Sequence, residues 1–128
     1  MSRLQAELGI LRVVWPAIQL KAEIPALYQQ AWPLFPGWNK PTTRLLVLIP
    51  AGYPATPPDN FLADPDLALA SGGTPGNTSP GPVVFGEDWL QFSYHVDTAD
   101  WTPHADPRQG HNLVTFLHGV NDRLRDPT

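Results

Sequence analysis

Residues 42–61 read TTRLLVLIPAGYPATPPDNF, and this stretch decides the fold. Its first part, Thr42 to Pro50, contains the continuous apolar run Leu45 to Ile49, which predicts a central strand covered on both faces. The strand leads straight into Tyr-Pro-Ala-Thr-Pro-Pro at residues 53–58. Proline fixes φ and lacks an N–H donor, so this part predicts a stiff turn rather than more strand. The other elements of the chain can be assigned relative to this buried strand and the rigid turn after it.

Upstream of this stretch, the pattern predicts a helix and two strands. Residues 2–15 carry apolar side chains at helical spacing, with Ser2 as the cap and Pro16 as the stop. The apolar stripe consists of Leu4, Leu8, Leu11 and Trp15. Alternating residues predict a half-buried strand over 18–24, and a second, weaker strand is expected near 26–32. The chain therefore enters its central strand from a helix and a short antiparallel run.

Downstream, residues 62–82 are rich in Gly, Pro, Ser and Thr and predict a long loop. Residues 90–96 alternate, with Leu90, Phe92, Tyr94 and Val96 on one face and Gln91, Ser93, His95 and Asp97 on the other. A second helix is predicted over 107–125, with Asp106 and Pro107 at its start. Its buried stripe comprises Leu113, Leu117, Val120 and Leu124. The order of elements predicts an α+β fold.

Composition narrows the possible functions. The 128 residues fit one domain, 1–128, and the net charge of −4 with eight Lys and Arg argues against nucleic-acid binding. The chain has no cysteine, which excludes disulfides, thiolate metal ligands and thioester chemistry by this chain alone. No apolar run approaches the ~20 residues that cross a bilayer, so we expect a soluble cytoplasmic protein without a membrane partner.

The order of elements and two motifs resemble the ubiquitin-conjugating (UBC) domain. The turn at residues 53–58 matches its Tyr-Pro-x-x-Pro-Pro motif, and Trp101-Thr102-Pro103 matches its later Trp-x-Pro signature. Among such domains, the chain is most similar to the prokaryotic UBC family E. The resemblance implies a UBC-like fold with an N-terminal helix, a four-stranded antiparallel meander, a long active-site loop and a C-terminal helix. It also implies a bacterial conjugation pathway, of the kind linked to antiphage defence, with a ubiquitin-like protein, a ubiquitin-activating-like enzyme and a target protein as partners.

The resemblance also points to a candidate catalytic position. In UBC domains the catalytic cysteine usually lies eight residues before the tryptophan of Trp-x-Pro, and here that position is Ser93. A serine hydroxyl can carry an acyl group as an oxyester when a base removes its proton. The hypothesis assigns Ser93 as nucleophile, His95 to proton transfer and Asp97 to orienting the imidazole, because all three share one face of the predicted strand.

Besides the missing cysteine, the chain departs from the family pattern at a second motif. The His-Pro-Asn tripeptide is absent, because position 85, eight residues before Ser93, is Phe85 and Asn77 lies further upstream. The oxyanion-stabilising group is therefore unassigned by sequence. No cofactor is implied. The histidines are not spaced as metal ligands, since His111 and His118 are seven residues apart.

Two other readings remain open at this level. Inactive relatives of conjugating enzymes lack the cysteine and bind ubiquitin-like proteins or peptides without becoming loaded. A structural domain of the RWD type shares the Tyr-Pro…Pro turn and serves in assembly. A binding module would hold the ubiquitin-like protein without a covalent bond, and an RWD-type domain would tolerate replacement of Ser93, His95 and Asp97.

Overall fold

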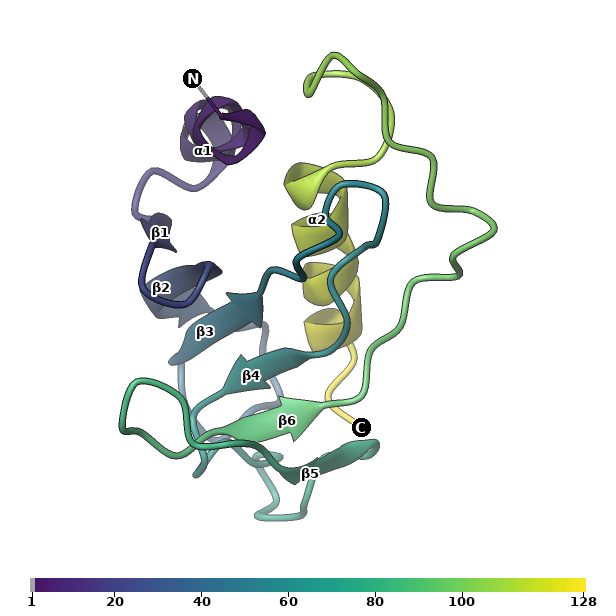
Figure 1. The fold of residues 1–128 in the computed structure, drawn as a ribbon. Coiled ribbons are helices and arrows are strands. Elements are labelled where there is room, and N and C mark those ends of the chain that lie inside the picture. The colour runs from purple at the N-terminus through teal and green to yellow at the C-terminus, as the bar shows by residue number, and fades with distance from the viewer. Residues whose placement is uncertain (1) are drawn as a thin grey trace.

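The computed structural model describes residues 2–128; Met1, the first residue of the predicted domain, lies outside the described residues. The strands form one antiparallel six-stranded sheet in the order β1-β2-β3-β4-β6-β5. Helix α2 lies across one face of this sheet, and helix α1 sits beyond β1 near the N-terminal end of α2 (Figure 1). In chain order the elements are α1 (Arg3–Val14), β1 (Gln19–Lys21), β2 (Ala26–Pro33), β3 (Thr42–Leu48), β4 (Phe61–Ala63), β5 (Thr78–Pro80), β6 (Leu90–Phe92) and α2 (Leu113–Arg125). The α+β class and the UBC-like meander, here β1 to β4, are confirmed.

Strand β3 occupies the centre of the sheet, as its apolar run predicts. It pairs with β2 on one side and with β4 on the other. Leu45 and Val47 join the core under the helices, whereas Leu46 belongs to a second core on the opposite face. Because successive strand residues point to opposite faces, a strand buried on both faces must be continuously apolar.

The two cores are covered by different kinds of structure. Helices α1 and α2 cover the first core, whose largest buried side chains include Trp32, Phe61, Phe92 and Phe116. The second core contains Leu46, Leu62, Val84 and Trp89. Its outer members lie in residues 81–89, the segment that connects β5 to β6. This connection is therefore packed as a lid on the sheet rather than left in solvent.

The N-terminal helix agrees with its prediction. The Ser2 side chain accepts a hydrogen bond from the Gln5 amide at 3.2 Å, which caps α1. The predicted start of the second helix is wrong, because α2 begins at Leu113 and residues 107–112 form turns before it. Asn112 is the cap and forms a reciprocal capping box with Thr115, a stronger start signal than Asp106 and Pro107. The predicted stripe is buried along α2, together with Phe116.

Three strand predictions need correction. The strand predicted over 18–24 covers only Gln19–Lys21, because Ala22 to Pro25 form the turn that pairs β1 with β2. The strand expected to be weak is β2, which has eight residues and is the longest described strand. The predicted loop 62–82 contains most of β4 and all of β5. Their three-residue lengths leave too little periodicity for detection from sequence.

Candidate active site

The Tyr-Pro turn is held in place by a buried carboxylate. Glu7 of α1 is 1% exposed and accepts a hydrogen bond from the Tyr53 hydroxyl at 2.7 Å. The same carboxylate accepts the Leu113 amide at the start of α2, at 2.7 Å, and pairs with Arg3 at 2.8 Å. Burial, together with the hydrogen bond to Glu7, raises the pKa of Tyr53 far above its usual value. Glu7 therefore joins both helices to the turn, and Tyr53 stays a donor.

The two signature motifs meet directly. The indole N–H of Trp101 donates to the carbonyl oxygen of Pro54 at 2.7 Å, across 47 residues of sequence. The Trp101 ring is buried and stacks on the His111 imidazole, with ring centroids 5.3 Å apart. The His111 Nδ1 atom in turn accepts the Thr102 amide at 2.9 Å. The Trp-x-Pro signature therefore fastens the chain after residue 97 to the Tyr-Pro turn.

The end of the Tyr-Pro stretch clamps the segment that follows β6. The Asn60 amide donates to the carbonyl oxygen of Tyr94 at 2.7 Å, and the Asn60 side chain accepts the Tyr94 amide at 3.3 Å. Asn60 has φ = 64°, a left-handed conformation that Asn tolerates better than most residues. Next to it, the Asp59 carboxylate pairs with Nδ1 of His95. Asp59 and Asn60 thus hold Tyr94 and His95 by backbone and side chain.

Ser93 lies at the exposed end of β6. The ladder stops at Phe92, shorter than the predicted strand to Val96, but exposure still alternates, with Ser93, His95 and Asp97 outward. The Ser93 amide donates to the carbonyl oxygen of Asn77 at 2.8 Å. β5 pairs with β6 so that Thr78 faces Phe92, and Asn77 takes the next register position, opposite Ser93. The long connection therefore brings an asparagine to the candidate nucleophile.

Asp97 contacts its own turn. Its carboxylate accepts the Ala99 amide at 2.9 Å, and its backbone carbonyl accepts the amides of Asp100 and Trp101 at 3.0 and 3.1 Å. Within residues 2–128, the carboxylate that pairs with His95 is Asp59. Asp97 therefore fixes the turn that leads into Trp101.

The structure brings together Ser93, Asn77, His95 and Asp59 at the outer end of the sheet. Sequence reasoning missed Asp59, although it stands between the matched prolines and Asn60. No hydrogen bond joins the Ser93 hydroxyl to His95 among the described residues. The spacing of residues along the chain predicts which side chains are exposed. It does not predict which residues they contact, because those contacts join segments that are far apart in the sequence.

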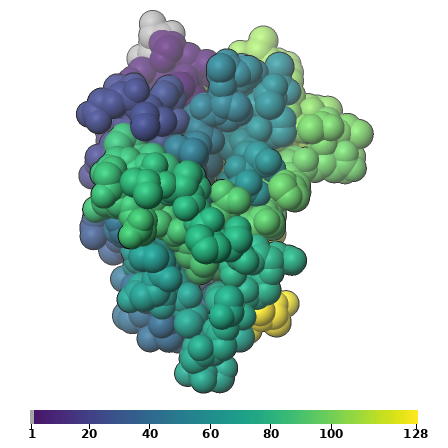
Figure 2. All heavy atoms as spheres, turned by 60° about the horizontal axis from the view of Figure 1, so that its bottom comes forward, coloured from purple at the N-terminus to yellow at the C-terminus, as the bar shows by residue number. Residues whose placement is uncertain are grey.

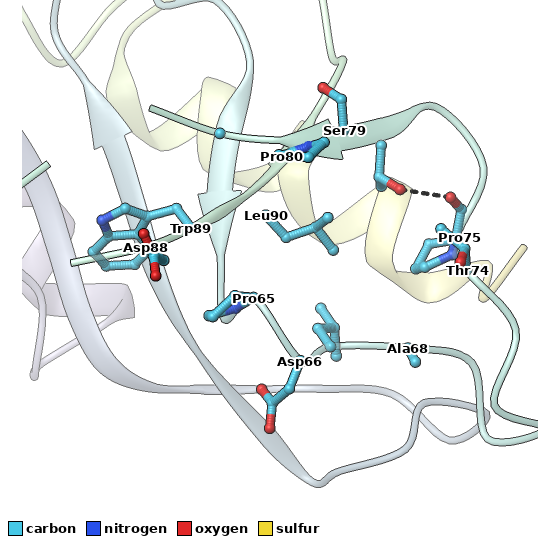
Figure 3. Close-up of a pocket in the computed structure, with 13 residues that line it drawn as sticks. Pro65, Asp66, Ala68, Thr74, Pro75, Ser79, Pro80, Asp88, Trp89 and Leu90 are labelled. Carbon is cyan, nitrogen blue, oxygen red and sulfur yellow. Dashed lines mark hydrogen bonds between the residues drawn. The ribbon is translucent and has the colours of Figure 1, made fainter. Parts of the chain in front are cut away.

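A groove of about 560 Å³ lies on the same hairpin as Ser93 but does not contain it. The groove is lined by residues 65–68, 74–75, 78–81 and 88–90. Figure 3 shows Leu90 between strand β5 and the 65–68 segment, and the hydrogen bond of the Thr78 hydroxyl to the Pro75 carbonyl, 2.7 Å long. Ser93, His95 and Asp97 are outside this lining, so the candidate nucleophile stands on an open surface.

Two other kinds of site are absent among residues 2–128. No group of three or more His, Asp or Glu side chains is arranged to hold a metal ion in this part of the chain. None of the described helices is long and apolar enough to cross a membrane.

Comparison with models of protein families supports the UBC-like fold. The sequence model of prokaryotic E2 family E matches residues 15–126, which includes every strand, both signature motifs and α2. No curated protein and no solved structure matches the chain. E2 proteins are ubiquitin-conjugating proteins, and their partners in general are a ubiquitin-like protein and its activating enzyme. With 112 of its 128 residues inside the match (126 − 15 + 1), the chain belongs to prokaryotic E2 family E.

Proposed function

We propose that this protein carries the C-terminus of a bacterial ubiquitin-like protein as an oxyester on Ser93 and passes it to an amine of a target protein. The observation that supports this most directly is the setting of Ser93. It is exposed, it stands eight residues before Trp101, and its amide is fixed by Asn77. An imidazole paired with a carboxylate lies two residues further along the same segment.

The first step is acylation of Ser93. The activating enzyme presents the C-terminal carboxyl group joined to AMP or, after transfer, to its own thiol. The Ser93 oxygen attacks the carbonyl carbon and its proton moves to Nε2 of His95. The bond to AMP or sulfur then breaks, and the leaving group departs with the electron pair. Asp59 holds the Nδ1 proton of His95, which leaves Nε2 as the acceptor.

The distance between Ser93 and His95 sets a condition on this step. Side chains two residues apart on an extended segment start roughly 6–7 Å apart, because the rise is ~3.3 Å per residue. Proton transfer needs a hydrogen bond of about 2.6–3.2 Å or one bridging water. Both side chains are exposed, so they have room to lean together when the acyl group arrives.

The second step releases the acyl group. Once His95 has given its first proton to the leaving group or to solvent, a target amine attacks the oxyester carbon and passes a proton to Nε2 of His95. The new amide forms, and the Ser93 oxygen leaves and takes that proton from His95. We assign the carboxamide of Asn77 to the negative charge on the carbonyl oxygen, because Asn77 occupies the register position opposite Ser93. Asp97 keeps a supporting role in this proposal, because it fixes the turn after His95.

The open position of Ser93 favours a protein substrate over a small molecule. Small-molecule sites are concave and bury most of the ligand. Ser93 lies outside the groove on its own hairpin, and the neighbouring His95 side chain is also exposed. A surface serine is accessible to a protein tail from one side and to a protein amine from another.

The test is an adduct assay with a bacterial ubiquitin-like protein, its activating enzyme and ATP. The wild-type protein should gain the mass of the ubiquitin-like protein, in a bond that resists thiol reductant and is cleaved by alkali. Ser93→Ala should abolish the adduct, and Ser93→Cys should convert it into one that reductant cleaves. Ser79→Ala is the matched control, because Ser79 is an exposed serine on the neighbouring strand β5. An adduct that survives in Ser93→Ala would refute the proposal.

A non-catalytic binding module is the second candidate. It is favoured by one observation, that no hydrogen bond links the Ser93 hydroxyl to His95 within residues 2–128. The same assay separates the two functions. A binding module co-purifies with the ubiquitin-like protein but gains no mass in wild type or in Ser93→Cys.

A further inference from the structure

The turn that carries Asn77 has little apolar anchoring of its own. It runs through Pro75 and Gly76 into Asn77, and only Pro75 of these three is buried. Asn77 has φ = 56°, in the left-handed region that costs a non-glycine residue energy unless its surroundings hold it. Contacts from elsewhere in the chain must therefore fix this conformation.

Arg123 of α2 supplies one of these contacts. Its Nη2 atom donates to the carbonyl oxygens of Gly76 and Thr128, each at 3.0 Å, and Nη1 donates to the carbonyl oxygen of Asp126 at 2.8 Å. The Gly76 amide closes the arrangement by donating to the Thr128 carbonyl at 2.9 Å. Figure 1 places the C-terminus next to the ends of β5 and β6, and Figure 2 shows the C-terminal residues, in yellow, at one side of the molecule next to teal-green residues.

These contacts fix Asn77 from both sides. The Gly76 carbonyl belongs to the peptide unit that precedes Asn77, and Arg123 binds it. The Asn77 carbonyl belongs to the peptide unit that follows, and the Ser93 amide binds it. With one hydrogen bond on each flanking peptide plane, the backbone angles of Asn77 are set by α2 on one side and by Ser93 on the other.

The charge of Arg123 is directed to backbone oxygens. No Asp or Glu side chain lies within ion-pair distance of its guanidinium among the described residues, and the guanidinium carbon is 5.2 Å from the centre of the Phe92 ring, next to Ser93 in sequence. Burial lowers the pKa of Arg123, but a guanidinium stays protonated at any physiological pH. Charge-assisted hydrogen bonds are about twice as strong as neutral ones, so this contact suits a holding role.

We propose that Arg123 is a positioning residue for acyl transfer at Ser93, acting by holding the Gly76–Asn77 peptide so that Asn77 stays opposite the nucleophile. This inference rests on the proposed function. Arg123 contacts neither the acyl group nor Ser93, so its effect passes through the turn. In this proposal, the last turn of α2 helps to position the active-site residue Asn77.

The experiment compares Arg123→Met with Arg125→Met and Arg123→Lys. Arg125 is the matched control, because it lies on the same helix turn but packs over Phe35, whereas the hydrogen bond to Gly76 comes from Arg123. In single-turnover assays with the ubiquitin-like protein and its activating enzyme, Arg123→Met should lower the maximal rate of adduct formation. We expect about tenfold or more, since small misplacements of reacting groups carry large losses. The half-saturating concentration of the loaded activating enzyme should not change.

Arg123→Lys retains the charge and should recover part of the rate, and Arg125→Met should behave as wild type. Hydrogen exchange gives a readout that needs no substrate. Arg123→Met should speed exchange at the Gly76 and Ser93 amides while exchange in β3 stays unchanged. Urea unfolding of all variants verifies that each is folded.

Three outcomes would overturn this role. They are an Arg123→Met protein that loads at the wild-type rate, an equal loss in Arg125→Met, or a loss confined to the half-saturating concentration. If wild type itself forms no adduct, the proposed function fails, and this role in acyl transfer fails with it. If wild type loads but the variants do not follow the expected order, only the role of Arg123 fails.

Discussion

Glu7 and Asp59 are two carboxylates beside the same Tyr-Pro stretch, and they are held in opposite ways. Glu7 is 1% exposed and accepts hydrogen bonds from α1, from Tyr53 and from the start of α2. The Asp59 side chain is 65% exposed and pairs with one imidazole, that of His95. The first contact joins three segments of the fold, whereas the second joins two neighbouring loops. The buried side of the Tyr-Pro stretch is therefore fixed by several contacts, whereas its exposed side is held by a single ion pair.

This difference follows from solvation. When one member of a buried ion pair is removed, the group that remains cannot form hydrogen bonds with water instead. The free energy of unfolding then falls by several kcal/mol. An exposed ion pair exchanges its partner for water at a cost near zero to about 1 kcal/mol. Substitutions should therefore change the free energy of unfolding most at the buried Glu7 and least at the exposed Asp59.

The largest effect is expected for Glu7→Ala. It leaves the Tyr53 hydroxyl, the Leu113 amide and Arg3 without their acceptor, and should lower the free energy of unfolding by about 3–5 kcal/mol. Urea denaturation followed by tryptophan fluorescence measures the change. Glu23→Ala, at an exposed carboxylate in the β1–β2 turn, is the control and should stay within about 0.5 kcal/mol. Equal effects at the two positions would remove the basis of the comparison.

The next largest effect is expected where α2 contacts Tyr94, between the buried and the exposed side of the Tyr-Pro stretch. A Cβ at Gly119 of α2 would overlap the Tyr94 hydroxyl, and Tyr94 packs edge-on against Phe116 next to the candidate site. Gly119→Ala should therefore displace Tyr94 and destabilise the protein by about 1–3 kcal/mol.

Gly9→Ala is its matched control, because Gly9 is exposed on α1 with no atom within 4 Å of an added Cβ. This change should stabilise the protein by about 0.5–1 kcal/mol through helix propensity. Thermal unfolding measures both variants. Two changes of the same sign would show that helix propensity, not the Tyr94 contact, governs position 119.

A half-buried carboxylate gives the intermediate case. Asp64, with a side chain that is 14% exposed, pairs with Lys40 at 2.7 Å and with Arg44 at 2.5 Å. Burial acts to raise the pKa of Asp64, but the hydrogen bonds from Lys40 and Arg44 outweigh it and hold the pKa below 3.8.

A carboxyl group whose pKa is lower in the folded state than in the unfolded state stabilises the protein at pH values above its unfolded-state pKa. This stabilisation is lost as the pH falls through the folded-state pKa. The unfolding free energy should drop as the pH goes below about 4, and Asp64→Asn should make this part of the curve flatter. Urea unfolding between pH 2.5 and 6 provides the measurement. A slope identical to wild type would show that Asp64 does not contribute.

The sequence predicts the buried side of this comparison better than the exposed side. A continuous apolar run identified β3, and apolar residues at helical spacing identified the buried stripe of α2, because a core requires such patterns of side chains. It missed Glu7, whose burial depends on a tyrosine and a helix terminus that are distant in sequence. It also placed the start of α2 at residue 107, where local turn residues imitate a helix cap.

On the exposed side, spacing predicted that Ser93, His95 and Asp97 face outward together, and the structure agrees. It did not predict which carboxylate meets His95, because Asp59 is 36 residues away in the chain. It did not bring Asn77 to Ser93 either, since these residues are 16 positions apart and meet only through the pairing of two three-residue strands. Pairwise contacts between loops leave almost no periodic trace in a sequence, so this part of the site needed coordinates.

The smallest stability effect and the sharpest functional one are expected at Asp59. Asp59→Asn should change the unfolding free energy by less than about 1 kcal/mol, because the pair with His95 is exposed. Its effect should appear in acyl transfer, since the carboxylate orients the imidazole that takes the Ser93 proton. Single-turnover adduct formation should slow several-fold in Asp59→Asn and in His95→Ala, and the double variant should be no slower than His95→Ala, as for residues that act as a unit.

Asp97→Asn, at the other acidic neighbour of His95, tests the alternative assignment: a larger loss there, with Asp59→Asn unaffected, would move the orienting role to Asp97. Rates that multiply in the double variant would separate Asp59 from His95 and leave the exposed side of the comparison without a catalytic role for this pair.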